Sequence, residues 1–196
     1  MEIIPIIKLK KRKILGHLKS SLKETLKEID ENEKIYILDL DGIEKYKPNF
    51  CTFQKLSDSY DLWVDFGPRN IGDIVDAVMA GTTAMTVRMP LRSKIEISEI
   101  RNITENKIFT NIDFEYQDKY DFEDLYLQLS DGLVTFNTRE LIESSFKNSD
   151  FLKTIGMKQK TYAYESNSKN SSYWKRFGFK GLLVELDKIK EFKDGL

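Results

Sequence analysis

The chain has 196 residues, a net charge of −1 and 40% hydrophobic residues, which is typical of a globular domain with a sizeable core. This balanced charge gives no electrostatic signature of nucleic-acid binding, and the basic cluster at residues 8–13 is typical of a solvated loop. The single cysteine excludes an internal disulfide, and no run of about 18 apolar residues is present to span a membrane. We therefore expect a cytoplasmic protein that binds neither nucleic acid nor membrane. Cys51 stands in the first turn of an expected helix, where we expect a packed side chain.

Apolar runs rich in β-forming residues recur along the chain and predict strands. They are IIPIIKL (3–9), KIYILDL (34–40), DLWVDF (61–66), AMTVRM (84–89), KIFTNIDF (107–114), GLVTFN (132–137), KTYAYES (160–166) and GLLVEL (181–186). The first two are almost continuously apolar, as is typical of strands that are buried on both faces.

Amphipathic segments separate these runs and predict helices. Residues 14–32 place leucine and isoleucine at three- and four-residue spacing, which predicts one long helix. Residues 69–81 start with a cap-like Asn70 and close with Gly81, so a second helix is expected there. Residues 121–129 and 137–146 also have helical spacing, and weaker helical patterns cover residues 90–105 and 168–178.

Strands alternating with helices predict a parallel sheet, and eight such units predict a compact single-domain (β/α)8 TIM barrel over residues 1–196. Such barrels usually need about 250 residues, so we expect shortened loops and helices throughout. A doubly wound open sheet is the alternative, but no G-x-G-x-x-G segment follows any strand. The short tail after residue 186 leaves little room for an eighth helix, and a homodimer would cover the wall that this leaves exposed.

Five segments follow the expected strands and turns in order along the chain: EIIPIIKLK (2–10), ILDLDGIEKYKPN (37–49), VDFGPRNIGDIVDAVMAGTTAMTV (64–87), NIDFEYQD (111–118) and GFKGLLVELDKIKEF (178–192). Together these segments resemble the ProFAR isomerases of histidine biosynthesis and their HisA/HisF superfamily. The resemblance implies a TIM barrel whose site lies at the carboxyl ends of the strands. The chain is similar to the HisA-related proteins, a group best known from archaea.

The resemblance also shows where the working residues of that family are replaced. Its general base, an aspartate ending strand one, corresponds to Lys8, whereas its second catalytic aspartate is kept as Asp113. Its phosphate-holding glycine positions correspond to Asp65, Arg88, Glu165 and Glu185. A carboxylate fills the space that glycine leaves open and repels an anion. We therefore expect a HisA-related protein that is not a ProFAR isomerase.

Charged residues end the predicted strands, where barrel enzymes work. Alternation places Ile4, Ile6 and Lys8 on one face, so Lys8 is expected to look into the mouth of the barrel. A desolvated lysine can act as a base or form a Schiff base, with Asp113, Asp39 or Asp65 moving protons. This predicts an isomerase or lyase with a small-molecule substrate. The expected substrate-binding residues are Asp65, Arg69, Arg88, Thr135, Asn137, Glu165 and Glu185.

Two other interpretations of these charges stay open. The carboxylates at the strand ends are oxygen ligands suited to Mg²⁺ or Mn²⁺, although no local spacing supports a metal site. The charges can also neutralise one another in a structural network, in a non-catalytic protein that binds a ligand or a partner protein.

Local alternatives remain at the turns. Thr135 and Asn137 also fit a cap between a strand and a helix, and Asp41 fits a cap beside Gly42. The polar segment 166–178 fits either a mobile lid over the mouth or a poorly ordered substitute for a helix, and Tyr173 and Trp174 favour some packing.

Overall fold

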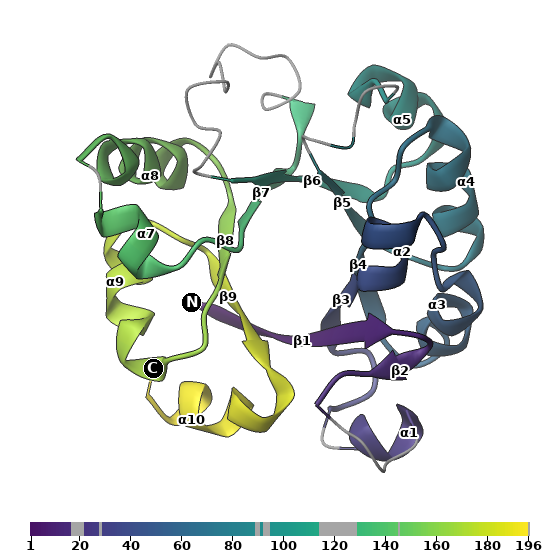
Figure 1. Cartoon of the computed structure of the whole chain (residues 1–196), viewed down its shortest axis with the longest axis horizontal. Helices are drawn as coiled ribbons and strands as arrows, with labels where there is room; N and C mark the ends of the chain where they lie inside the picture. The colour runs from purple at the N-terminus through teal and green to yellow at the C-terminus, as the bar shows by residue number, and fades with distance from the viewer. Residues whose placement is uncertain are drawn as a thin grey trace. The chain divides into compact units, whose positions relative to one another are not determined.

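The computed structural model describes residues 1–16, 22–27, 29–88, 91, 95–113, 129–144 and 146–195. In this part of the chain the strands form one sheet in the order β2-β1-β3-β4-β5-β6-β7-β8-β9, and β1 also pairs with β9 (Figure 1). Apart from the short antiparallel β2 and the connection from β6 to β7, most of which lies outside the described residues, helices separate successive strands along the chain. This is the strand order of a (β/α)8 barrel, so the predicted fold class is confirmed.

Every predicted strand is present. The strands are β1 (Glu2–Lys10), β3 (Lys34–Asp39), β4 (Asp61–Asp65), β5 (Ala84–Arg88), β6 (Lys107–Ile112), β7 (Gly132–Thr135), β8 (Thr161–Tyr164) and β9 (Gly181–Glu185). Most of their residues are buried, which explains why apolar content located them well.

The helices match the sequence less closely. They are α1 (Leu22–Thr25), α2 (Leu40–Lys45), α3 (Phe50–Ser57), α4 (Ile71–Met79), α5 (Ile97–Ile103), α7 (Arg139–Glu143), α8 (Phe146–Lys158), α9 (Ser171–Arg176) and α10 (Ile189–Asp194), with 3-10 turns at Ser168–Asn170 and Leu186–Lys188. Asn70 caps α4 as predicted. The segment 121–129 lies almost wholly outside the described residues. Within the described residues, no helix is long and apolar enough to cross a membrane.

The helix predicted over residues 14–32 is wrong at its start. Lys13–Ile14 instead forms β2, which pairs antiparallel with the end of β1. The two residues of the connecting turn, Lys11 and Arg12, both have positive φ, at 52° and 61°. Such turns favour asparagine and glycine, so the Lys-Arg pair gave no hairpin signal.

The chain forms two units, and the first, residues 6–107, is called the N-terminal unit. Its register pairs Ile6 with Tyr36, Tyr36 with Trp63, and Lys8 with Leu38. Side chains paired in register point to the same side of a sheet. These residues therefore share one face, which we call the inner face.

The opposite face of these strands packs against helices. Phe66, which follows β4, makes edge-on ring contacts with Phe50 and Phe53 of α3. Gly42 of α2 lies against the same segment, because a Cβ atom there would be 2.4 Å from the carbonyl oxygen of Phe66. A side chain at this position would push α2 away from the strand.

The second unit, residues 1–5 and 108–196, is called the C-terminal unit. Its register pairs Phe109 with Gly132, and Tyr162 with both Val134 and Gly181. These residues share one face, the inner face of this unit, where the ring centres of Phe109 and Tyr162 lie 5.7 Å apart. The other face forms a core with the helices, built from Ile112, Leu133, Ile142, Leu152, Ile155, Ala163, Tyr173, Trp174, Phe179, Leu182, Val184 and Phe192.

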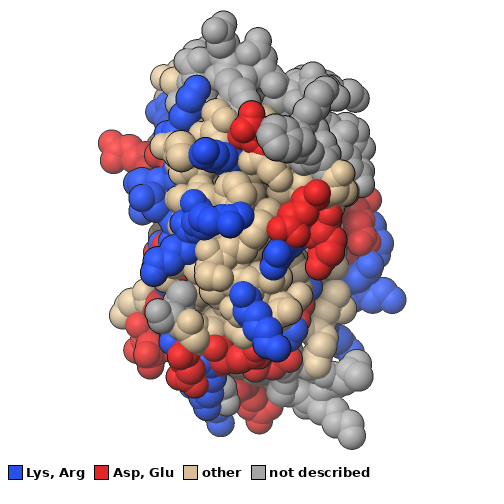
Figure 2. All heavy atoms as spheres, turned by 90° about the vertical axis from the view of Figure 1, so that its left-hand side faces the viewer, with Lys and Arg blue, Asp and Glu red and all other residues tan. Residues whose placement is uncertain are grey.

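The tail of the chain forms a helix after all. In α10, Phe192 is fully buried in the core of the C-terminal unit. The homodimer stays a prediction, but it loses the exposed wall on which it was based. Figure 2 shows side chains of both charges on the side of the C-terminal unit that carries α7, α8 and α9, with uncharged side chains between them.

Candidate functional site

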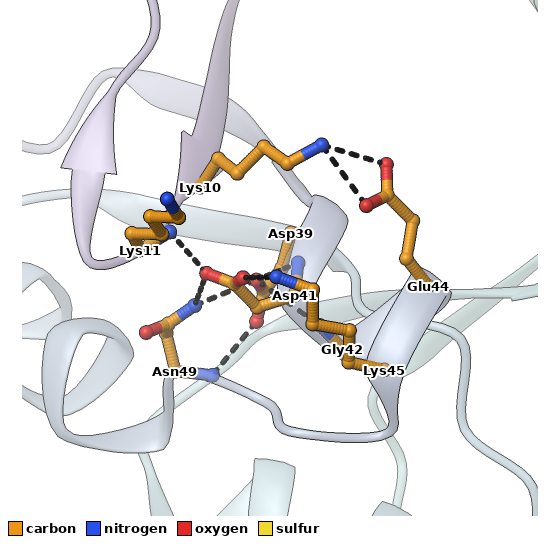
Figure 3. Close-up of polar contacts among 8 residues, drawn as sticks. All are labelled: Lys10, Lys11, Asp39, Asp41, Gly42, Glu44, Lys45 and Asn49. Carbon is orange, nitrogen blue, oxygen red and sulfur yellow. Dashed lines mark hydrogen bonds and ion pairs between the residues drawn. The ribbon is translucent and has the colours of Figure 1, made fainter.

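Asp39 ends β3 and holds the turn into α2. Its Oδ1 atom accepts hydrogen bonds from the backbone N–H of Asp41 (3.2 Å) and Gly42 (3.4 Å) and from Nδ2 of Asn49 (2.7 Å). Its Oδ2 atom accepts from the backbone N–H of Asn49 at 2.7 Å (Figure 3). The register pairs Asp39 with Leu9, on the face opposite to Lys8. Asp39 is therefore the N-cap of α2, the role that the sequence suggested for Asp41.

Asp41 links this turn to the β1–β2 hairpin. Its carboxylate accepts the backbone N–H of Lys11 and lies 3.5 Å from Nζ of Lys45. Burial by itself would raise its pKa, but these two groups and Asn49 outweigh that effect and hold the pKa below its usual value. For Asp39, burial raises the pKa, and the hydrogen bonds from Asn49 and Gly42 only partly oppose the rise.

Asp65 and Arg88 form a buried ion pair on the inner face of the N-terminal unit. The guanidinium binds with two nitrogens: Nε lies 2.9 Å from Oδ1, and Nη2 lies 2.7 Å from Oδ2. Asp65 is fully buried, whereas the Arg88 side chain is 21% exposed. Tyr36 donates its hydroxyl to Oδ2 at 3.0 Å. Burial and the negative charge of Asp65 raise the pKa of Tyr36 well above its usual value.

Arg69 points to α2 instead. Its Nη2 atom donates to the carbonyl oxygen of Ile43 at 3.1 Å, and its guanidinium lies 4.7 Å from the centre of the Tyr46 ring. The backbone N–H groups of Arg69 and Asn70 donate to Oδ2 of Asp73. The backbone N–H groups of the turn before α4 are thus bound by a carboxylate of the same chain.

Glu165 does the same at the turn after β8. Its Oε1 atom accepts the backbone N–H of Ser166 and of Asn167, both at 2.8 Å. Its Oε2 atom accepts Nε1 of Trp174 at 2.8 Å and Nδ2 of Asn170 at 3.2 Å. Trp174 is fully buried. Segment 166–178 therefore contains a packed turn and helix in place of an irregular loop, and the lid interpretation stays a prediction.

Asp113, directly after β6, meets Asn137 after β7. Nδ2 of Asn137 donates to Oδ1 of Asp113 at 3.0 Å, and the Thr135 hydroxyl donates to Oδ1 of Asn137 at 3.0 Å. The cap of α7 is Thr138, which accepts the N–H of Leu141. The cap interpretation of Asn137 is therefore wrong, and its amide orients a half-buried carboxylate.

Two aromatic residues beside Glu185 were not singled out from the sequence. Tyr164 donates its hydroxyl to Oε1 of Glu185 at 2.9 Å. The ring of Phe136 stacks on that of Tyr164, with centres 6.0 Å apart and planes at 26°. Alternation along β7 and β8 would have placed both on the face of Tyr162.

The predicted site residues thus divide into several groups. Lys8, Asp65 and Arg88 share the inner face of the N-terminal unit, whereas Asp39 and Arg69 serve the turns on the helix side. Asp113 belongs to the C-terminal unit, so its pairing with Lys8 stays a prediction.

In the described part of the chain, the structure gives no support to a metal site. Among the described residues, no three His, Cys, Asp or Glu side chains are grouped so that they could hold a metal ion. Asp39, Asp65 and Glu165 are already bound by donors of the protein.

Cys51, expected to be packed, is exposed as a free thiol.

Neither a protein-family model nor a curated protein matches this chain. The relation to the HisA/HisF superfamily therefore stays a prediction.

Proposed function

We propose that the chain is a HisA-like barrel protein that acts on a small molecule as an isomerase or lyase, with Lys8 and Asp113 as its reacting groups. The supporting observation is a difference in burial among the charged residues at the strand ends. Asp39 and Asp65 are fully buried. Lys8 and Asp113 are only half-buried at the carboxyl ends of β1 and β6.

The proposed chemistry uses a carbonyl substrate. The neutral amine of Lys8 adds to the carbonyl carbon, and loss of water gives an imine. Asp113 passes the protons that the amine loses to the departing water, and then moves protons at the neighbouring carbon, with its orientation set by Asn137. Return of the proton to a different carbon would make the reaction an isomerisation. Cleavage of a substrate bond beside the imine would make it a lyase reaction.

The bound turns argue against ProFAR isomerase activity itself. Phosphates bind where backbone N–H groups at a turn or helix start are available. Glu165 takes those donors after β8, and Asp73 takes them before α4. This supports a substrate without two phosphate groups.

A non-catalytic protein that binds a ligand or partner is the second candidate. The ion pair of Asp65 with Arg88, completed by Tyr36, favours it, because it uses charges at the strand ends for structure. In that case Lys8 and Asp113 would be further members of the network.

Trapping with borohydride tests the proposed chemistry. The protein is incubated with a panel of small aldehydes and ketones, reduced, and mapped by mass spectrometry. We expect selective modification of Lys8, and loss of that adduct in Lys8→Arg. The matched control is Lys10→Arg on the same strand, since Lys10 is bound to Glu44 at 3.0 Å. Equal labelling of Lys8 and the surface lysines would remove the Schiff-base chemistry.

A further inference from the structure

The carboxyl ends of β7, β8 and β9 carry an aromatic pair beside a carboxylate. Phe136 follows β7, Tyr164 ends β8 and Glu185 ends β9, and all three are half-buried. The Tyr164 hydroxyl donates to Glu185 at 2.9 Å, and its ring stacks on Phe136. We call these three residues the aromatic platform.

The sheet register explains why the platform forms at the end where substrates bind. Thr135 pairs with Ala163, and Tyr164 pairs with Leu183. Phe136 and Glu185 lie one and two positions beyond these pairs, so they alternate onto the face of Tyr164. Below them on that face lies Tyr162, whose ring is in contact with Phe109.

The chemistry of the aromatic platform favours one kind of ligand. Aromatic faces attract flat rings and cations. An ionised carboxylate accepts hydrogen bonds and cannot donate them, so it pairs with N–H or O–H groups. The hydroxyl of Tyr164 is directed to Oε1 of Glu185, which fixes this carboxylate beside the rings. We propose that the platform binds a flat ring carrying a positively charged or N–H-rich substituent. The proposal names the class of substrate. It rests on the proposed function, in which the substrate binds at the carboxyl ends of the strands.

Three small probes separate the two features of such a ligand. Benzylammonium has both a ring and a positive charge, benzoate has the ring with a negative charge, and cyclohexylmethylammonium has the charge without the aromatic ring. Their affinities are measured by NMR titration of the full chain. We expect benzylammonium to bind about tenfold more tightly than either of the others.

Two variants assign the preferences to residues. Phe136→Leu should remove the preference for the aromatic ring, and Glu185→Gln should remove the preference for the cation while keeping an acceptor for Tyr164. The matched control is Glu191→Gln, an exposed carboxylate on α10, which should change neither preference. If Phe136→Leu fails to fold, Tyr164→Phe replaces it: the ring preference should stay and the cation preference should fall.

Equal affinity for the three probes, or no saturable binding of benzylammonium, would overturn the platform. These probes carry no carbonyl group, so their binding does not depend on imine formation at Lys8. Selective binding without trapping at Lys8 would therefore support the platform and reject the proposed chemistry. Trapping at Lys8 without any preference among the probes would do the reverse.

Discussion

Asp65→Asn should lower the free energy of unfolding by about 3–5 kcal/mol, the usual cost of breaking a buried ion pair from one side. The carboxylate of Asp65 accepts two nitrogens of Arg88 and the hydroxyl of Tyr36. An amide cannot neutralise the guanidinium, and its NH₂ group would face these donors. Urea denaturation followed by tryptophan fluorescence measures the change.

The exposed pair of Lys10 and Glu44 provides the matched control. Its side chains are 36% and 44% exposed, so Glu44→Gln should cost about 1 kcal/mol or less. The double variant Asp65→Leu with Arg88→Met should recover most of the stability lost in Asp65→Asn, because it removes both charges together. A cost below about 1 kcal/mol for Asp65→Asn would show that the ion pair does not hold the inner face together.

Glu165→Gln should lower the free energy of unfolding by about 1–3 kcal/mol, because one of its oxygens becomes a donor. Oε1 can still accept the two backbone N–H groups of Ser166 and Asn167. The new NH₂ group then faces the indole N–H of Trp174 and the amide of Asn170, which leaves donors pointing at one another.

The same denaturation experiment tests this prediction, with the emission of the buried Trp174 as a second signal. Glu191→Gln, whose carboxylate accepts the exposed hydroxyl of Ser168, is the control and should change stability by about 0.5 kcal/mol or less. A Glu165→Gln variant as stable as that control would contradict the packed role of segment 166–178.

Strand positions were predictable because each strand is a short apolar run, and burial imposes that pattern directly on the sequence. The helices were harder to predict. Helix α2 follows β3 with no loop, and its cap, Asp39, is itself the last strand residue. Helix α8 was missed because polar residues interrupt its apolar spacing, as in the stretch Lys147–Asp150.

For the candidate site, the sequence predicted the face of a side chain only where side chains alternate regularly along a strand. Alternation placed Lys8 correctly on the face of Ile6, and the register with Tyr36 confirms it. Asp39 was expected beside Lys8 because both end strands. A shift of one residue along the strand moves a side chain to the other face, and only the register shows that Asp39 pairs with Leu9.

Glu165 could not be placed from the sequence for a related reason. Its partners Asn170 and Trp174 follow it closely, but they reach it only because the segment winds into a turn and α9. A polar stretch of this kind is typical of a loop. In the structure the segment instead forms a 3-10 turn and α9, with Tyr173 and Trp174 buried.

Because the proposed chemistry uses Lys8 and Asp113, the decisive measurement is the rate of carbonyl trapping at Lys8 in Asp113→Asn. Asparagine keeps the size of the side chain and removes its ability to move a proton. Positioned acids and bases typically contribute about 10²–10⁴-fold, so we expect trapping at Lys8 to slow by about a hundredfold in a variant that remains folded. An unchanged trapping rate would contradict the account and leave Asp113 as a structural partner of Asn137.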